Sequence, residues 1–365
     1  MTSAFLIENI ENITVNISRD LLALLMLLHP LIAGAVGVAD GKEPVAAKAQ
    51  WHVVKEWGQK SFPASVPAGN YSGITHLKDN VYAVVSDKSD SALFFRFRID
   101  VDSLTGELHQ VEMIDGVGKV DAAGLDHEAI ALTPDSTLVL SSEGKLRLKE
   151  YTLAGEPTGW AKMWNAADFW PNYGFESLCY DDARQCLWTI SEAPLRKDGE
   201  PSTPQNQKKG LLRLMALQGD SVVAQFTYAT DAPSTRKAAQ TYTMGVSELC
   251  ALPDGQLLVL EREAFVPKRK LGAFCKCSLY VVNPADANGI QRDSSTAAPP
   301  LSKQLLCQWQ TSLTLFGRSW ANYEGMCLGP TLKDGSRVLL LLSDSQDQYA
   351  GVLRDWWKTI ILKRQ

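Results

Sequence analysis

The sequence has few of the features that mark common classes of enzyme and binding protein. It contains no Cys-x-x-Cys pair and few histidines, so a structural zinc site is not expected. It has no Gly-x-Ser-x-Gly segment, no dinucleotide fingerprint and no phosphate-cradling Gly-rich loop, so neither a conventional serine esterase nor a nucleotide cofactor is indicated. It also lacks excess positive charge. With 36 Lys and Arg against 41 Asp and Glu, the net charge is −5, which argues against a nucleic-acid binder.

The first forty residues have the order of a secretory signal. Arg19 precedes the apolar run 21–28, and small residues follow up to Ala39. The run is too short for a comfortable membrane span. We therefore predict a signal peptide over residues 1–39 and a single domain over residues 40–365, periplasmic or secreted. The alternative is a retained N-terminal anchor.

The seven cysteines are an odd number and cannot pair completely. Cys179 and Cys186 flank a predicted hairpin turn, so they are candidates for a disulfide in an oxidising compartment. We expect most of the others to be buried as small apolar side chains.

One pattern recurs five times, and helix-period patterns are nearly absent after the N-terminal segment. A short apolar strand, often opened by Glu, leads through a turn to a second strand that ends in an acidic residue. The five copies span residues 71–87, 127–143, 175–192, 247–261 and 323–344. A third strand follows each copy and a fourth follows several. Such four-stranded units predict an all-β propeller with one blade per unit.

The last copy lacks a fourth strand, and an orphan strand, residues 51–57, precedes the first copy. Pairing the two would close the ring and remove exposed sheet edges. We therefore predict five blades closed by the N-terminal strand. The alternatives are a sixth, degenerate blade and a large β-sandwich.

The acidic residues recur at two positions of each copy. In a propeller blade, the start of the first strand and the end of the second lie at the same rim. The predicted inner ring contains Glu128, Glu176, Glu248 and Glu324. The predicted outer ring contains Asp87, Glu143, Glu192, Glu261 and Asp344. So many carboxylates need a cation, basic partners or protons, because like charges raise one another's pKa.

Many oxygen ligands favour a hard cation, and Ca²⁺ fits best. The predicted metal ligands are Glu128, Glu176, Glu248, Glu324, Asp87 and Asp344. Arg262, Lys88 and His127 adjoin these positions and would neutralise part of the charge. The alternative is that several of these acids bond backbone N–H groups or Ser and Thr side chains between blades.

Two long loops leave the same rim, residues 193–210 and 263–276, and both carry several Lys and Arg. Basic loops over an acidic, metal-loaded mouth suit a small anionic substrate. Without an obvious nucleophile, the economical mechanism is metal-assisted hydrolysis. We predict Glu176, Glu324 and His127 as catalytic residues, and Arg262 and Lys88 as substrate-binding residues.

Four of these segments resemble the phytase-like family described as "esterase-like activity of phytase". They are residues 126–131, 172–178, 258–262 and 322–326, and Ser343-Asp344 matches the end of the family's last motif. The resemblance implies a propeller in exported bacterial proteins, with phosphatase or esterase activity. The sequence departs from the pattern at Gly73, where later copies have Glu, and directly after Asp344.

The resulting hypothesis is an exported, calcium-dependent hydrolase of phosphate esters or related small esters, acting as a monomer. Two alternatives stay open. One is a non-catalytic envelope propeller that binds a ligand or partner around a structural calcium. The other is a lactonase-like propeller.

Overall fold

A computed structural model describes residues 50–120, 125–287, 289, 298–315, 317–346, 348 and 353–365. The predicted signal peptide, residues 1–39, lies outside this part of the chain. Within it, the helices are two short 3-10 turns, η1 (Ala166–Asp168) and η2 (Pro284–Asp286). Among the described residues, no helix is long and apolar enough to cross a membrane.

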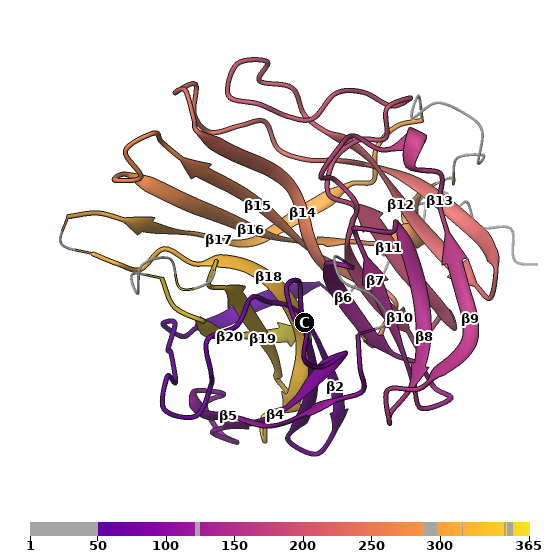
Figure 1. Ribbon diagram of the computed structural model, residues 1–365, viewed down its shortest axis with the longest axis vertical. Coiled ribbons are helices and arrows are strands. Elements are labelled where there is room, and N and C mark those ends of the chain that lie inside the picture. The colour runs from indigo at the N-terminus through magenta and orange to yellow at the C-terminus, as the bar shows by residue number, and fades with distance from the viewer. Residues whose placement is uncertain are drawn as a thin grey trace, which may run out of the picture. The chain divides into compact units, whose positions relative to one another are not determined.

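The strands form five four-stranded antiparallel sheets (Figure 1). The first blade contains β2 (Tyr71–Lys78), β3 (Val81–Ser86), β4 (Phe94–Val101) and β5 (Leu108–Val117). The second contains β6 (His127–Leu132), β7 (Thr137–Ser142), β8 (Arg147–Thr152) and β9 (Pro157–Met163). The third contains β10 (Phe175–Asp181), β11 (Cys186–Ser191), β12 (Leu211–Gln218) and β13 (Ser221–Ala229). The fourth contains β14 (Thr241–Ala251), β15 (Leu257–Val266), β16 (Ala273–Val282) and β17 (Lys303–Leu313).

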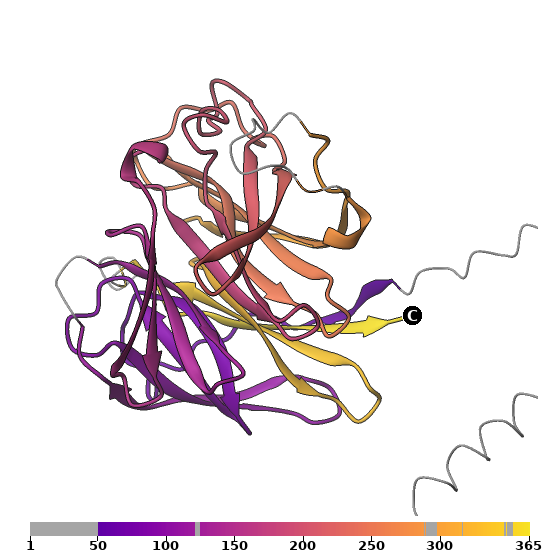
Figure 2. The ribbon, with the colours of Figure 1, turned by 90° about the vertical axis from the view of Figure 1, so that its right-hand side faces the viewer.

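The fifth blade is built from both ends of the domain. It contains β18 (Asn322–Thr331), β19 (Arg337–Asp344), β20 (Trp357–Arg364) and the N-terminal strand β1 (Trp51–Glu56). Figure 2 shows indigo β1 beside the yellow C-terminal strand, and Trp51 pairs with Arg364. The all-β propeller with five blades and an N-terminal closing strand is therefore confirmed. The sixth blade and the β-sandwich are wrong, since these five sheets account for the repeats.

The core lies between neighbouring blades, because both faces of each sheet are covered. Between the fifth and first blades, Trp357 packs with Phe97, Tyr82 and Leu340, all of which are buried. The strands β2, β6, β10, β14 and β18 contact one another around the ring, so each is the innermost strand of its blade. Burying a large apolar side chain contributes about 1.5–3 kcal/mol, and these interfaces repeat around the ring.

All seven cysteines are free thiols. The register of β10 and β11 pairs Cys186 with Asp181, whereas Cys179 pairs with Trp188. The expected Cys179–Cys186 disulfide is therefore wrong for this structure, because the two residues do not face each other across the hairpin. Cys186 is buried, as expected for a small apolar side chain.

Candidate metal and active site

A β-bulge interrupts the inner strand of every blade, and the residues at and beside it form the candidate site. In the fifth blade Tyr323 pairs with Ser343 and Gly325 with Leu342, which leaves Glu324 as the extra residue. We call this the bulge position. Directly after the paired Ser comes the rim position, here Asp344. A bulge re-aims the side chain that it carries, and it is often found next to functional sites.

The same two positions recur in all five blades. The bulge residues are Ser72, Glu128, Glu176, Ser247 and Glu324. The rim residues are Asp87, Glu143, Glu192, Arg262 and Asp344. These residues lie at one end of the ring, which we call the acidic end. The structure therefore brings together most of the acidic residues that the repeats single out.

The fourth blade departs from the predicted assignment by one residue. Val246 pairs with Glu261 and Gly245 with Arg262, so Ser247 is the bulge residue and Arg262 the rim residue. A shift of one residue turns a strand's side chains to the opposite face. Glu261 accordingly accepts hydrogen bonds from the Tyr228 hydroxyl at 2.6 Å and the Asp231 amide at 2.9 Å, away from the acidic end.

Glu248, predicted as a metal ligand, has a different environment from the acids at the bulge positions. Its carboxylate accepts hydrogen bonds from the backbone N–H groups of Leu178 at 3.1 Å and Leu249 at 2.9 Å. Burial raises its pKa well above the ordinary value. Glu248 therefore links the inner strands of neighbouring blades. The sequence leaves this structural role open as the alternative to metal binding.

Arg262 occupies the middle of the acidic end. Its guanidinium bonds the carboxylates of Glu192 and Glu324, and its Nη2 lies 3.9 Å from Glu176 Oε2. Asn322 Oδ1 accepts a further hydrogen bond at 2.9 Å. Burial opposes ionisation of Arg262, but the carboxylates outweigh it and raise its pKa. These acids therefore have an internal counter-ion, and the guanidinium is too occupied for the predicted substrate-binding role.

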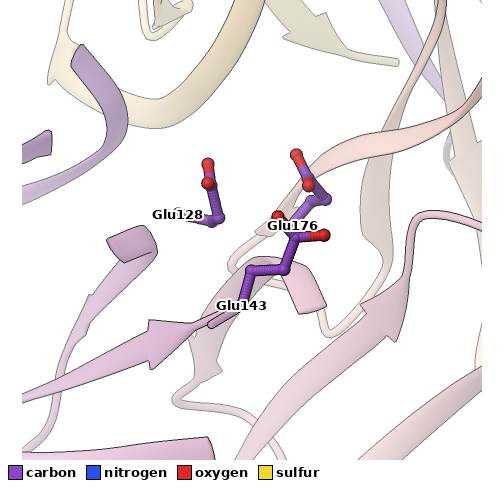
Figure 3. Close-up of side chains that lie close together, drawn as sticks. All are labelled: Glu128, Glu143 and Glu176. Atoms are coloured by element: carbon purple, nitrogen blue, oxygen red, sulfur yellow. The ribbon is translucent and has the colours of Figure 1, made fainter. Parts of the chain in front are cut away.

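Three carboxylates of the acidic end lie close to one another, and one of them, Glu176, is also the more distant partner of Arg262. Oxygens of Glu128, Glu143 and Glu176 all lie within 4.8 Å of each other, and Figure 3 shows the carboxylates gathered in one region. Oxygens that share one Ca²⁺ at about 2.3–2.6 Å can be separated by up to roughly twice that distance. The three side chains therefore fit a hard cation. Glu143, from the rim, joins the predicted ligands Glu128 and Glu176.

Crowding and burial change the protonation of this group. Burial, followed by Glu324, Asp87 and Glu143, raises the pKa of Glu128 well above its ordinary value. Burial, with Glu192 and Asp126 next, raises the pKa of Glu143 to about 7. Without a cation, protons therefore take part of the role of a counter-ion. A bound divalent cation would favour the ionised forms and displace these protons.

The first and fifth blades add two further predicted ligands. Asp344 is buried, and its pKa is raised by burial, by Glu324 and by Asp87. Asp344 accepts a hydrogen bond from the Gln346 amide at 2.7 Å. Lys88 Nζ lies 3.4 Å from Asp87 Oδ2, with half of its side chain exposed. Asp87 and Asp344 thus flank the Glu128 side of the acidic end, and Lys88 offsets part of their charge.

His127, predicted to be catalytic, precedes the bulge residue of the second blade. It pairs with Ser142, as Phe175 pairs with Ser191 and Tyr323 with Ser343. Phe175 and Tyr323 are core residues, and His127 is buried. The position therefore argues for packing rather than proton transfer.

A cavity of about 300 Å³ opens beside the acidic end, between the second and third blades. Its lining includes the acidic residues Glu143 and Asp126, the aromatic residues Trp170 and Tyr173, and Arg196. Sequence reasoning missed the aromatic residues here, because they lie in the irregular segment before β10. Tyr173 falls in segment 172–178, which resembles the family, whereas the signal for Trp170 was the cluster of Trp, Pro, Asn and Tyr at 170–173.

The Lys and Arg residues of the two predicted basic loops do not gather around the cavity as expected. Lys208 pairs with Glu200 at 2.9 Å on the surface. The expected loop 263–276 is largely strand, because β15 extends to Val266 and β16 starts at Ala273. Of the predicted basic overhang, Arg196 is the residue that lines the cavity beside Glu143.

The phytase-like family described as esterase-like activity of phytase matches residues 66–346. This region includes all five bulge and rim positions. No curated protein matches the chain.

Solved structures with a similar fold have low sequence identity. A luciferin-regenerating enzyme is 11% identical, with 84% of this chain and 95% of that chain covered and a TM-score of 0.40. Virginiamycin B lyase from Staphylococcus aureus is 7% identical, covering 85% and 99%, with a TM-score of 0.35. Regucalcin, a calcium-binding protein from Agrobacterium tumefaciens, is 12% identical, covering 82% and 92%, with a TM-score of 0.36.

Proposed function

This chain belongs to the phytase-like family, and on that premise we propose that it is a calcium-dependent hydrolase of phosphate esters or related small esters. The observation that carries the proposal is the group formed by Glu128, Glu143 and Glu176 beside an open cavity. We further propose that the protein acts in the periplasm or outside the cell, as a monomer on a small anionic substrate.

The three carboxylates have different surroundings, and these suggest different roles. Glu128 and Glu176 are buried and suit the binding of a cation. Glu143 is less buried and lines the cavity, where a substrate would lie. A calcium ion at this place would polarise an ester or phosphoryl oxygen and favour ionisation of water.

Glu143 is the best placed proton acceptor. Its Oε1 is buried and has no hydrogen-bond partner among the described residues. Without a metal, burial and neighbouring carboxylates raise the pKa of Glu143 to about 7. A bound calcium ion would lower this pKa and keep Glu143 ionised, which is the form a proton acceptor needs near neutral pH. Arg262 pairs with Glu192 and Glu324 and opposes the rise in pKa that burial causes in both, so it stabilises the charge of the site without contacting the substrate.

The proposal is tested with p-nitrophenyl phosphate and p-nitrophenyl acetate, with calcium or with EDTA. We expect turnover that EDTA abolishes and calcium restores. Glu128→Gln removes one ligand charge and is expected to lower both calcium affinity and kcat/KM by about 10–100-fold, the range seen when groups that support a metal are changed.

Glu248→Gln is the matched control, because Glu248 is also a buried glutamate of an inner strand but bonds backbone N–H groups. The amide oxygen of Gln can accept the same bonds, so calcium affinity and turnover are expected to stay near those of the wild type. Turnover that survives EDTA, or equal losses in both variants, would contradict the proposal.

A non-catalytic ligand-binding propeller is the second candidate. It is favoured by the burial of Arg262 and its bonded acids, which resembles a structural ion network more than an exposed reactive centre. Calcium would then raise the melting temperature, while no ester of either series would be hydrolysed. A lactonase-like activity would appear as calcium-dependent turnover of lactones without turnover of phosphate esters.

A further inference from the structure

The cavity beside Glu143 is lined by chemically different groups. Its lining includes the carboxylates of Glu143 and Asp126. It also includes Arg196 and Trp170, and the Arg196 guanidinium lies over the Trp170 ring, 4.7 Å from its centroid. Phe169 and Leu146 line the wall. A molecule that fills the cavity would therefore contact the proposed reactive carboxylate, apolar side chains and a cationic guanidinium stacked on an indole ring.

Backbone contacts fix the Arg196–Trp170 stack in place. Arg196 Nε donates to the Phe169 carbonyl at 2.6 Å, and its backbone N–H donates to the Asp168 carbonyl at 2.8 Å. Trp170 Nε1 donates to the Gly199 carbonyl at 2.9 Å. The stack joins the segment that follows η1 to the loop between β11 and β12. Because both side chains are held, little conformational entropy would be lost when a ligand binds against them.

We infer that this cavity is the specificity subsite of the proposed hydrolase, and that it takes the leaving group of an aryl ester with an anionic substituent on its ring. The ring packs against Trp170 and Phe169, and the anionic substituent pairs with Arg196. The scissile ester then lies next to Glu143. A cavity of about 300 Å³ is at the small end of ligand sites, which suits a single substituted ring.

This inference rests on the proposed function, and its test uses leaving groups that differ in shape and charge. The phosphate series is 4-carboxyphenyl phosphate, phenyl phosphate and glycerol phosphate, and the acetate series is 4-acetoxybenzoate, phenyl acetate and ethyl acetate. In whichever series the wild type hydrolyses, we expect kcat/KM to fall in the order given. Equal values across the series would overturn the inference while leaving the hydrolase proposal intact.

Arg196→Ala removes the guanidinium from the lining of the cavity. We expect KM for the carboxyphenyl substrate to rise about tenfold or more, as for loss of a charge-assisted contact, with kcat nearly unchanged. Hydrolysis of the uncharged aryl and the alkyl leaving groups should change little. Trp170→Ala should weaken both aryl substrates and spare the alkyl substrate. Uniform losses over all three substrates in either variant would contradict the subsite.

Arg354→Ala is the matched control, because Arg354 lies over the Trp356 ring at 5.8 Å and lines a different cavity. It should change none of these constants. If no ester is hydrolysed, binding of 4-carboxyphenyl phosphate by calorimetry separates the two ideas. Binding that Arg196→Ala weakens and Arg354→Ala spares supports the subsite without the hydrolase. No binding, or binding insensitive to Arg196, overturns it.

Discussion

The second and fourth blades both have a β-bulge in the inner strand, but the side chains at their rim positions have opposite charge. In the second blade the bulge and rim positions carry Glu128 and Glu143, whereas in the fourth they carry Ser247 and Arg262. The acidic end is therefore divided into two parts. One part contains its own counter-ion, and the other has carboxylates close enough to share a cation. The comparison shows that the repeated fold fixes where side chains meet, while the residues at the bulge and rim positions decide whether their charge is balanced within the protein.

Removing the charge of the fourth blade should have the largest effect. Arg262→Gln leaves Glu192 and Glu324 buried without their guanidinium partner. Loss of one partner from a buried ion pair costs about 3–5 kcal/mol, so we expect the free energy of unfolding at pH 7 to fall by about that amount. Urea unfolding followed by tryptophan fluorescence measures the change.

Arg213→Gln is a control for the loss of any buried arginine, since Arg213 bonds Asp198 at 2.5 Å and is fully buried in the third blade. Calcium should restore part of the stability of Arg262→Gln, because the released carboxylates lie beside the proposed cation. It should not restore Arg213→Gln. If calcium raised the free energy of unfolding equally in both variants, the acidic end would not be divided into the two parts described above.

The fold followed from the sequence because each blade repeats the same alternation of apolar residues and turns. The ring closure also followed, because strand 51–57 had no other partner. The convergence of the bulge and rim acids in the other blades was accessible for the same reason. The chain positions of these acids repeat, and in a propeller equivalent positions meet around the axis.

The fourth blade was misaligned because a glutamate stands one residue after the bulge position. Leu178-Cys179 in the third blade corresponds to Leu249-Cys250 in the fourth, and this shared pair gives the correct register. On that alignment Ser247, not Glu248, matches Glu176. The Ser that precedes the rim acid in the other blades is a second signal, because Glu261 takes its place and Arg262 takes the acid's.

The arrangement of the cavity was not accessible from the repeats. Trp170 and Arg196 come from two irregular segments that differ from blade to blade. Their stack depends on hydrogen bonds to the Phe169 and Gly199 carbonyls, and backbone contacts of this kind leave no periodic pattern in the sequence. Loops of this type carry specificity because the rigid blades leave them free to vary.

A smaller effect is expected for the network that holds the displaced glutamate of the fourth blade. Tyr228→Phe removes the hydroxyl that bonds Glu261 at 2.6 Å, while Lys303 still pairs with Glu261 at 2.5 Å. We expect a loss of about 1.5 kcal/mol in the free energy of unfolding, the low end for a hydrogen bond to a charged group. Calcium affinity, measured by calorimetry, should not change. A loss of calcium binding would place Glu261 in the metal site after all.

The last test of the comparison is how the free energy of unfolding changes with pH in the absence of calcium. The pKa values of Glu143 and Glu324 are raised to about 7, chiefly by burial, from an ordinary value of 4.5. Between these values the folded protein binds more protons than the unfolded chain, so the stability contributed by these groups falls as pH rises from about 4.5 to about 7. Each group can contribute at most about 1.4 kcal/mol per pH unit.

Melting temperatures in EDTA should therefore decrease over this range, and Glu143→Gln should flatten the decrease. Calcium should reduce it, because the proposed cation would replace protons as the counter-ion of Glu128, Glu143 and Glu176. Glu248→Gln provides the comparison from the fourth blade, since calcium should still reduce the decrease in that variant. A decrease that calcium leaves unchanged in the wild type would mean that protons and Arg262, without a metal, balance the charge of the acidic end.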